Sequence, residues 1–233
     1  MGNNDIVYFV KASAHNEELR YSLRSVEQNF PHRKVWIYGG KPSDIEPDEF
    51  VPIRQVGSNK WEKVRNMLWK ACQNPDITDD FFLFNDDFFV MHKIESYEPI
   101  FDGTVYQWII SVEGRNFDAP TAYTLELRKM IHELEHKGIT DELKNYAVHM
   151  PMLVNKSKMI DVIREFDSPM FRNIYGNYWH IGGTNLKDMK ILRRNQVIEE
   201  DAPYLSSDDN AFMFKEIGQY IKNKFQGKSR FEK

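Results

Sequence analysis

Cysteine is almost missing from the chain, which limits the kinds of site that it can encode. Its one cysteine, Cys72, cannot form an internal disulfide, and a single thiolate is too few for a cysteine-based zinc site. The place of Cys72 on an apolar helical face predicts a small buried side chain. No apolar run approaches the length of a bilayer span, so we expect no membrane-spanning segment. The first five residues are polar and acidic, and we therefore expect no signal peptide and a cytoplasmic protein.

The chain also has no large excess of charge of one sign. Its formal net charge of -4 argues against a large nucleic-acid footprint, although residues 222–233 contain five lysines and arginines. We interpret that basic tail as a solvated end. The 16 Phe, 11 Tyr and 5 Trp are too many large rings for a disordered chain. At 233 residues we expect one globular domain with a substantial core.

Strands alternate with amphipathic helices through the first half of the chain. Apolar runs at residues 6–10, 34–38, 51–56 and 81–84 predict strands, and apolar residues at helical spacing follow the first and third of them. Ser58 or Asn59 is expected to cap the helix before the last strand. This alternation predicts an α/β fold with a mostly parallel sheet flanked by helices.

The second half of the chain is less regular. Residues 106–112 predict a further strand, and the apolar spacing after them predicts a helix that ends at Gly138. A short helix is expected around residues 159–166, and a last helix from about 208 to 221. Residues 171–183 hold no clean period, and we interpret them as loops that form the site.

Two adjacent acids, Asp86 and Asp87, follow the most apolar predicted strand, residues 81–84. Four consecutive large apolar residues predict a strand buried on both faces. Ligands of open α/β sheets bind at the carboxyl ends of the strands, and carboxylates there suit a divalent cation with the phosphates that it carries. Asn-Asp-Asp is also ordinary turn chemistry, so an acidic turn is the alternative.

Basic residues at helical spacing are the next candidates. Arg20 and Arg24 lie four residues apart and share one face of the first predicted helix, where paired guanidinium groups suit phosphate oxygens. The alternative is a solvated helix surface with Glu17 or Glu18 as partners. Lys63 has the same two interpretations.

Three further residues are candidates for catalysis. His149 lies in an apolar extended segment before Pro151, where a buried structural histidine is the alternative. Arg172 stands beside aromatic residues and would need an anionic partner if it were buried; otherwise it is a loop arginine. Asp208 and Asp209 can cap the last predicted helix, and one of them can also serve as a base or metal ligand.

Taken together and in this order, these segments resemble the Stealth family of nucleotide-sugar-dependent sugar-phosphate transferases, and more broadly the GT-A glycosyltransferase fold. The family's ELRYSLRS block corresponds to residues 18–25, its FLYFNDD block to residues 82–87, and its HxP segment to residues 149–151. Residues 8–13 replace the family's Trp-Val-Asp-Gly string, so an acid expected to contact the donor is missing from its place. The compact chain is what we expect of a bacterial or phage-type version.

The resemblance implies roles for the candidate residues. Asp86 and Asp87 would bind Mn²⁺ or Mg²⁺ together with the donor diphosphate. His149 with Arg172 would act on the transferred group or the acceptor hydroxyl, and we keep Asp209 as a third catalytic candidate on the residue pattern alone. Arg20 would contact the donor phosphate, and we predict Arg24, Lys63 and Asn85 as further donor-binding residues.

The resemblance also implies an organisation of the chain. A single domain, residues 1–233, would have a nucleotide-sugar-binding half at 1–90, an acceptor and catalytic half at 91–221, and the basic tail at 222–233.

The expected reaction is transfer of a sugar, or of a sugar with its phosphate, from a nucleotide-sugar to an acceptor hydroxyl on a glycan or a polymer of the cell-wall or capsule type. One alternative is a non-catalytic module that binds a glycan or a nucleotide through rings such as Tyr178 and Trp179. Another is sugar transfer to modified phage DNA, which the acidic net charge disfavours.

Overall fold

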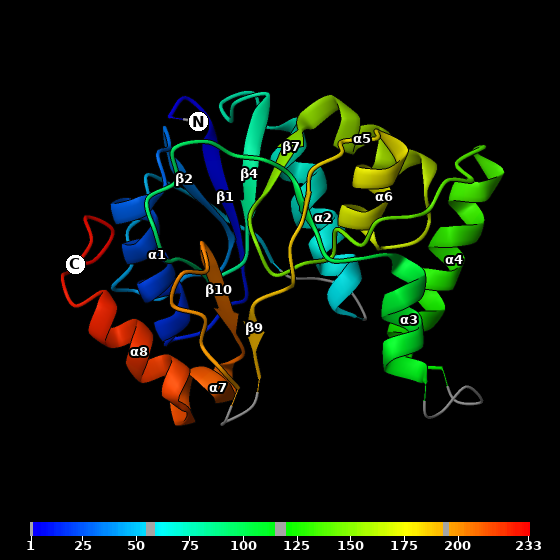
Figure 1. Cartoon of the computed structure of the whole chain (residues 1–233). Helices are drawn as coiled ribbons and strands as arrows, with labels where there is room; N and C mark the ends of the chain where they lie inside the picture. Colours follow the sequence, from blue (N-terminus) through cyan, green and yellow to red (C-terminus); the bar gives the residue numbers. More distant parts are fainter. Residues whose placement is uncertain (1, 55–58, 115–119, 193–195) are drawn as a thin grey trace.

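A five-stranded sheet forms the centre of the computed structural model, which describes residues 2–54, 59–114, 120–192 and 196–233. Its strand order is β3-β2-β1-β4-β7. The first four strands of this order are parallel to one another, and the edge strand β7 is antiparallel to β4. The strands are β1 (Asp5–Val10), β2 (Val35–Gly39), β3 (Glu49–Pro52), β4 (Asp80–Phe84) and β7 (Met152–Asn155). The prediction of an α/β fold with a mostly parallel sheet is confirmed (Figure 1).

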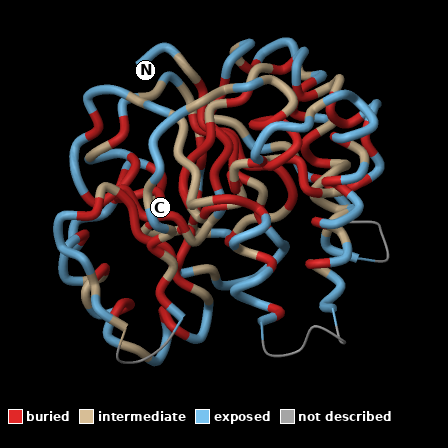
Figure 2. The backbone as a smooth tube through the Cα atoms, turned by 45° about the vertical axis from the view of Figure 1, so that its right-hand side comes forward, coloured by how far each residue is buried: buried red, intermediate tan, exposed pale blue. Residues whose placement is uncertain are grey.

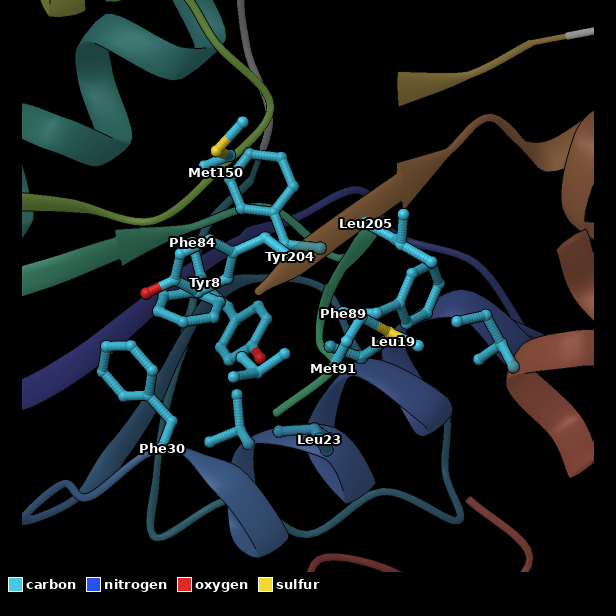
Figure 3. Close-up of a cluster of buried hydrophobic side chains, with 14 of the residues drawn as sticks. Tyr8, Leu19, Leu23, Phe30, Phe84, Phe89, Met91, Met150, Tyr204 and Leu205 are labelled. Carbon is cyan, nitrogen blue, oxygen red and sulfur yellow. The ribbon is translucent and has the colours of Figure 1, made fainter. Parts of the chain in front are cut away.

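Helices cover both faces of this sheet. Alternate side chains of β4 belong to two different hydrophobic clusters: Phe82 and Phe84 pack on the side of α1 (Glu17–Asn29), and Phe81 and Leu83 on the side of α2 (Lys60–Gln73). The first cluster also includes Tyr8 (Figure 3). Strand β4 is therefore buried on both faces, as its apolar run predicted, and the buried segments gather at the middle of the molecule (Figure 2).

Local capping explains where the first helices begin. The Asn16 side chain accepts a hydrogen bond from the Leu19 backbone at the start of α1. Asn59 caps α2 as predicted, whereas the alternative cap Ser58 lies outside the described residues. Strand β3 ends at Pro52, so the prediction of a strand over 51–56 was displaced toward the carboxyl side; residues 55 and 56 lie outside the described part.

Two predictions for the second half of the chain were wrong. Residues 106–112 are helical, within α3 (Val105–Glu113), because Thr104 and Gln107 form a capping box that starts a helix. Residues 171–178 form helix α6 (Phe171–Tyr178) rather than loops. Asn173 and Asn177 interrupt its apolar pattern in the sequence, yet both are buried and accept hydrogen bonds from the backbone of residues 144–147.

The remaining elements follow β4 in the chain. The last predicted helix is two helices, because Lys215 between them is extended. Strands β7 and β10 were not predicted. These further elements are α4 (Ala122–His136), α5 (Lys156–Glu165), α7 (Asp209–Phe214), α8 (Glu216–Lys224), β5 (Phe88–Val90), β6 (Ile100–Phe101), β8 (Thr184–Asn185), β9 (Lys190–Ile191) and β10 (Tyr204–Ser207). Among the helices of the described ranges, none has the length and apolar character needed to cross a membrane.

The basic tail is not a solvated end. Phe225 and Phe231 are buried in the first hydrophobic cluster. The buried Glu232 carboxylate accepts hydrogen bonds from Arg24 at 2.7 Å and from Arg20 at 3.0 Å. The exposed lysines of the tail concealed this anchor, because the buried residues stand singly among them.

We expect Glu232→Ala to lower the free energy of unfolding by about 2–4 kcal/mol, because it removes the carboxylate that two guanidinium groups share. Burial alone would raise the pKa of Glu232, but hydrogen bonds from Arg24, the Ser229 backbone and Arg20 lower it from 4.5 to about 2. A folded-state pKa below the unfolded value adds stability above pH 4.5 that is lost as the pH falls toward 2.

Urea unfolding at a series of pH values measures both effects. The pH dependence in that acid range should be weaker in Glu232→Ala than in the wild type. Glu135→Ala, at an exposed position of α4, serves as the control and should change stability by less than about 0.5 kcal/mol. Equal stability of the Glu232 variant and the wild type would contradict an anchoring role.

Candidate functional site

The candidate site lies where the direction of strand addition changes in the sheet. From β1 the chain adds β2 and then β3 on one side, and it then crosses to add β4 on the other side of β1. The loop after β1 and the loop after β4 therefore diverge at the carboxyl edge, which leaves a crevice between them. Asn85, Asp86 and Asp87 follow β4 at this crevice, and Asn16 begins α1 across from them.

Asp86 lies at the centre of the crevice. The Asn16 side-chain amide donates a hydrogen bond to Asp86 Oδ2 at 2.6 Å, which joins the two loops. Burial raises the pKa of the Asp86 carboxyl to about 6, with the charge of Asp87 acting in the same direction and the Asn16 hydrogen bond against it. A cation beside Asp86 would lower the free-energy cost of keeping the two adjacent carboxylates ionised.

Asp87 points toward the strands of the second half of the chain. Lys190 Nζ lies 2.9 Å and Ser206 Oγ 3.2 Å from Asp87 Oδ2. Asp87 Oδ1 is buried and has no hydrogen-bond partner in the described part of the protein. Neither Lys190 nor Ser206 was predicted as a site residue. Ser206 stands directly before the Ser-Asp-Asp run, the one signal in the sequence that could have indicated it.

A small acidic cavity adjoins these two residues. It has a volume of about 390 Å³, and Glu18 and Asp209 line it together with Asp86 and Asp87. Burial and a hydrogen bond with Asp209 raise the pKa of Glu18 to about 9, although Ser207 Oγ donates to Glu18 Oε1 at 2.6 Å. Sequence reasoning treated Glu18 only as a surface partner of the arginines and missed this position.

Asp208 and Asp209 both line the acidic cavity but make different contacts. The Asp208 side chain accepts a hydrogen bond from the Ala211 backbone and caps α7, as one of the two interpretations predicted. Asp209 borders the acidic cavity beside Glu18. The structure therefore brings Asp209 to the same cavity as Asp86 and Asp87.

Arg172 holds the His149 segment against β4. Its guanidinium donates to the carbonyl oxygens of Val148 at 2.8 Å and Met150 at 2.7 Å, and also to that of Leu83 in β4 at 3.3 Å. Its partners are therefore carbonyl dipoles, where the sequence indicated an anion. Burial lowers the pKa of Arg172 to about 10. His149 lies beside Phe88, with the two ring centroids 6.5 Å apart.

Two larger cavities meet at Asp86. The first, about 640 Å³, is lined by Lys63 and Asn85, with Trp61 and Phe171 as apolar walls. The second, about 750 Å³, is lined by Arg20 and Asp209. Asp86 lines both of them and the small acidic cavity as well.

The two arginines of α1 turn toward the tail rather than toward Asp86. Arg24 donates to Glu232 and to the carbonyl oxygens of residues 225 and 226. Arg20 binds Glu232 and Asp44, and it borders the second cavity as well. Their partners are thus neither Glu17 nor Glu18.

The described residues contain no ready-made group of three or more His, Cys, Asp or Glu side chains that could hold a metal ion. Asp86 and Asp87 do fit a hard divalent cation that takes its other ligands from substrate and water. The Oδ1 atom of Asp87 is buried without a hydrogen-bond partner in the described part of the protein, and a cation bound there would stabilise both carboxylates.

We expect Arg172→Met to lower the free energy of unfolding by about 2–4 kcal/mol, because three backbone carbonyl groups lose a donor. Lys70→Met, an exposed change on α2, is the matched control and should cost less than about 0.5 kcal/mol. Chemical denaturation measures both. A cost no larger than that of the control would contradict the role of Arg172 in fastening the His149 segment.

Comparison with known proteins gives little further identification. No family model matches the chain, and no curated protein matches it either. A structure of glycosyltransferase GlyE in Streptococcus pneumoniae TIGR4 is 8% identical, with 55% of this chain and 43% of that chain covered and a TM-score of 0.32. The apo-form of GlyE is 11% identical, with 70% and 44% covered and a TM-score of 0.29. The matched part spans less than half of the GlyE chain, and TM-scores of this size do not establish a shared fold.

Proposed function

We propose that this protein is a metal-dependent transferase that moves a sugar, or a sugar with its phosphate, from a nucleotide-sugar to an acceptor hydroxyl. The observation that carries the proposal is the position of Asp86 and Asp87 at the point where the sheet changes direction, with Asp86 shared by three cavities. Two substrates that enter from different sides would meet at such a residue. The donor diphosphate and the acceptor hydroxyl must meet in this way for transfer to occur.

The cavity of about 640 Å³ suits the donor. Its basic lining residues are Lys11, Lys60, Lys63 and Arg172, and Asp86 is its one acidic residue among those that the structure describes. Ammonium groups bind phosphate oxygens, and the Trp61 ring offers a face for a nucleotide base. A mostly apolar pocket with a few charged groups at one end is typical of small-molecule sites.

Asp86 and Asp87 would hold the metal ion, with Asn85 beside them at the end of β4. Bound there, Mn²⁺ or Mg²⁺ would neutralise the charge that develops on the leaving phosphate. Lys190 Nζ, 2.9 Å from Asp87, adds a second positive group on the same side. The protein's own part is to orient the diphosphate against these charges.

His149 and Asp209 are the two candidates for the group that removes the proton from the acceptor hydroxyl. Asp209 borders the cavity of about 750 Å³, which is open to an acceptor on the α1 side. His149 packs against Phe88 and belongs to the segment that Arg172 fastens. The loss of rate in His149→Ala compared with that in Asp209→Ala identifies which of them acts.

The released nucleotide distinguishes the two reactions. Glycosyl transfer breaks the bond between the anomeric carbon and oxygen and releases a nucleoside diphosphate. Sugar-phosphate transfer breaks the diphosphate and releases a nucleoside monophosphate. Incubation with a panel of nucleotide-sugars, Mn²⁺ and glycan acceptors, followed by mass spectrometry of the released nucleotide, decides between them. Metal-dependent nucleotide binding without release of either would instead indicate a binding module.

We expect Asp87→Asn to reduce turnover by at least about 100-fold, because it removes one of two charged ligands from the metal site. Mn²⁺ binding, measured by electron paramagnetic resonance with the donor nucleotide present, should weaken in parallel. Asp79→Asn changes an exposed acid before β4 and should leave both quantities unchanged. Wild-type turnover and Mn²⁺ affinity in the Asp87 variant would rule out the metal site.

A further inference from the structure

Asp188 makes two hydrogen bonds to the same residue, His149. Asp188 Oδ2 lies 2.6 Å from His149 Nδ1, and Asp188 Oδ1 accepts from the His149 backbone N–H at 3.1 Å. The two contacts fix both the side-chain torsions of the histidine and the position of its backbone relative to the carboxylate. This is more constraint than a single ion pair would give.

The other ring nitrogen of His149 is free. No residue in the described part of the chain is hydrogen bonded to His149 Nε2, and the side chain is 35% exposed. Phe88 packs against the ring at a steep angle, and Arg172 binds the carbonyl groups on both sides of His149. The imidazole is therefore held on one side and open on the other.

The carboxylate is itself held in place. The Asp188 backbone N–H donates to Asp102 Oδ2 at 3.0 Å. Two residues later, Lys190 binds Asp87. The short segment 188–190 therefore connects the candidate base to the candidate metal ligand, although His149 and Asp87 are distant in the sequence.

We propose that Asp188 is a positioning residue that keeps neutral His149 in the tautomer with its proton on Nδ1, so that Nε2 can accept a proton from the acceptor hydroxyl. The inference rests on the proposed transfer reaction. A carboxylate can only accept a hydrogen bond, so Nδ1 must donate, and in the neutral ring the lone pair then resides on Nε2. The choice of tautomer follows from the identity of this one partner.

In the transfer step the acceptor O–H bond breaks and its proton forms a new N–H bond at Nε2. The acceptor oxygen bonds to the anomeric carbon or to the phosphorus of the donor. The bond from that atom to the oxygen of the leaving nucleotide breaks, and its electron pair leaves with the nucleotide. Asp188 then lies against an imidazolium and stabilises its charge. No oxidant or further reactant is needed.

The ¹⁵N chemical shifts of the His149 ring test the tautomer without any substrate. The chain has seven histidines, and the signals lost in His149→Gln identify the right ring. At about pH 8.5, well above the ordinary histidine pKa, the wild type should show a protonated Nδ1 and an unprotonated Nε2. In Asp188→Asn the new amide should donate to Nδ1 and move the proton to Nε2, while its oxygen keeps the backbone hydrogen bond.

Turnover then tests the consequence. We expect Asp188→Asn to lower kcat by about 10²–10⁴-fold with little change in the KM of the donor, and Asp188→Glu to recover part of the loss. Asp201→Asn, which changes an exposed acid 13 residues after Asp188, is the control and should alter neither the tautomer nor kcat.

Each unfavourable outcome has its own meaning. A wild-type ring with the proton on Nε2, or an Asp188→Asn protein with unchanged kcat, would overturn the role of Asp188. A wild type that shows the Nδ1 proton but turns over no nucleotide-sugar would overturn the proposed function and leave the tautomer assignment standing.

Discussion

The burial of β4 on both faces is the constraint on which the site depends. Residues 81–84 are enclosed between two hydrophobic clusters, so no ionised group can be carried along the strand without a large desolvation cost. The first place where a carboxylate can meet water or a cation is the end of the strand, and Asp86 and Asp87 stand there. The same apolar run that stabilises the core thus fixes where the chemistry is placed, and it gives the acids a rigid base.

Local patterns in the sequence were sufficient for the first half of the fold. Strands β1, β2 and β4 each have a continuous apolar run, helices α1 and α2 have apolar residues at helical spacing, and the edge of the sheet that carries Asp86 follows from their alternation. The second half was harder, because its polar residues are satisfied by distant backbone groups. Asn173 in α6 is read as a loop residue in the sequence, but it is a buried acceptor in the structure. Only the folded chain shows that these distant backbone groups satisfy the buried side chain.

The site was predictable to the same extent. The structure brings Asp86, Asp87 and Asp209 to one cavity, and their roles stay predictions. These three were predicted from position and chemistry. Glu18, Asp188, Lys190 and Ser206 were not, because each acts through a contact with a residue far away in the sequence. Single polar residues on short strands or buried helix faces carry no periodic signal. Whether Arg20, Arg24 and Lys63 contact a donor stays a prediction, and Arg24 already has its charge satisfied by the tail.

The anchoring of the tail changes the electrostatic character of one entrance to the site. Glu232 and Asp44 neutralise Arg20, so this guanidinium brings no uncompensated positive charge to the cavity of about 750 Å³ that it borders. Lys11 lines both cavities, whereas Lys60 and Lys63 line only the one of about 640 Å³. Under the proposed transfer reaction, the cavity with Lys60 and Lys63 would attract a polyanionic donor more strongly than the cavity that Arg20 and Glu17 border. The C-terminal segment, which contributes no group to Asp86 itself, would in this way help to decide which substrate arrives from which side.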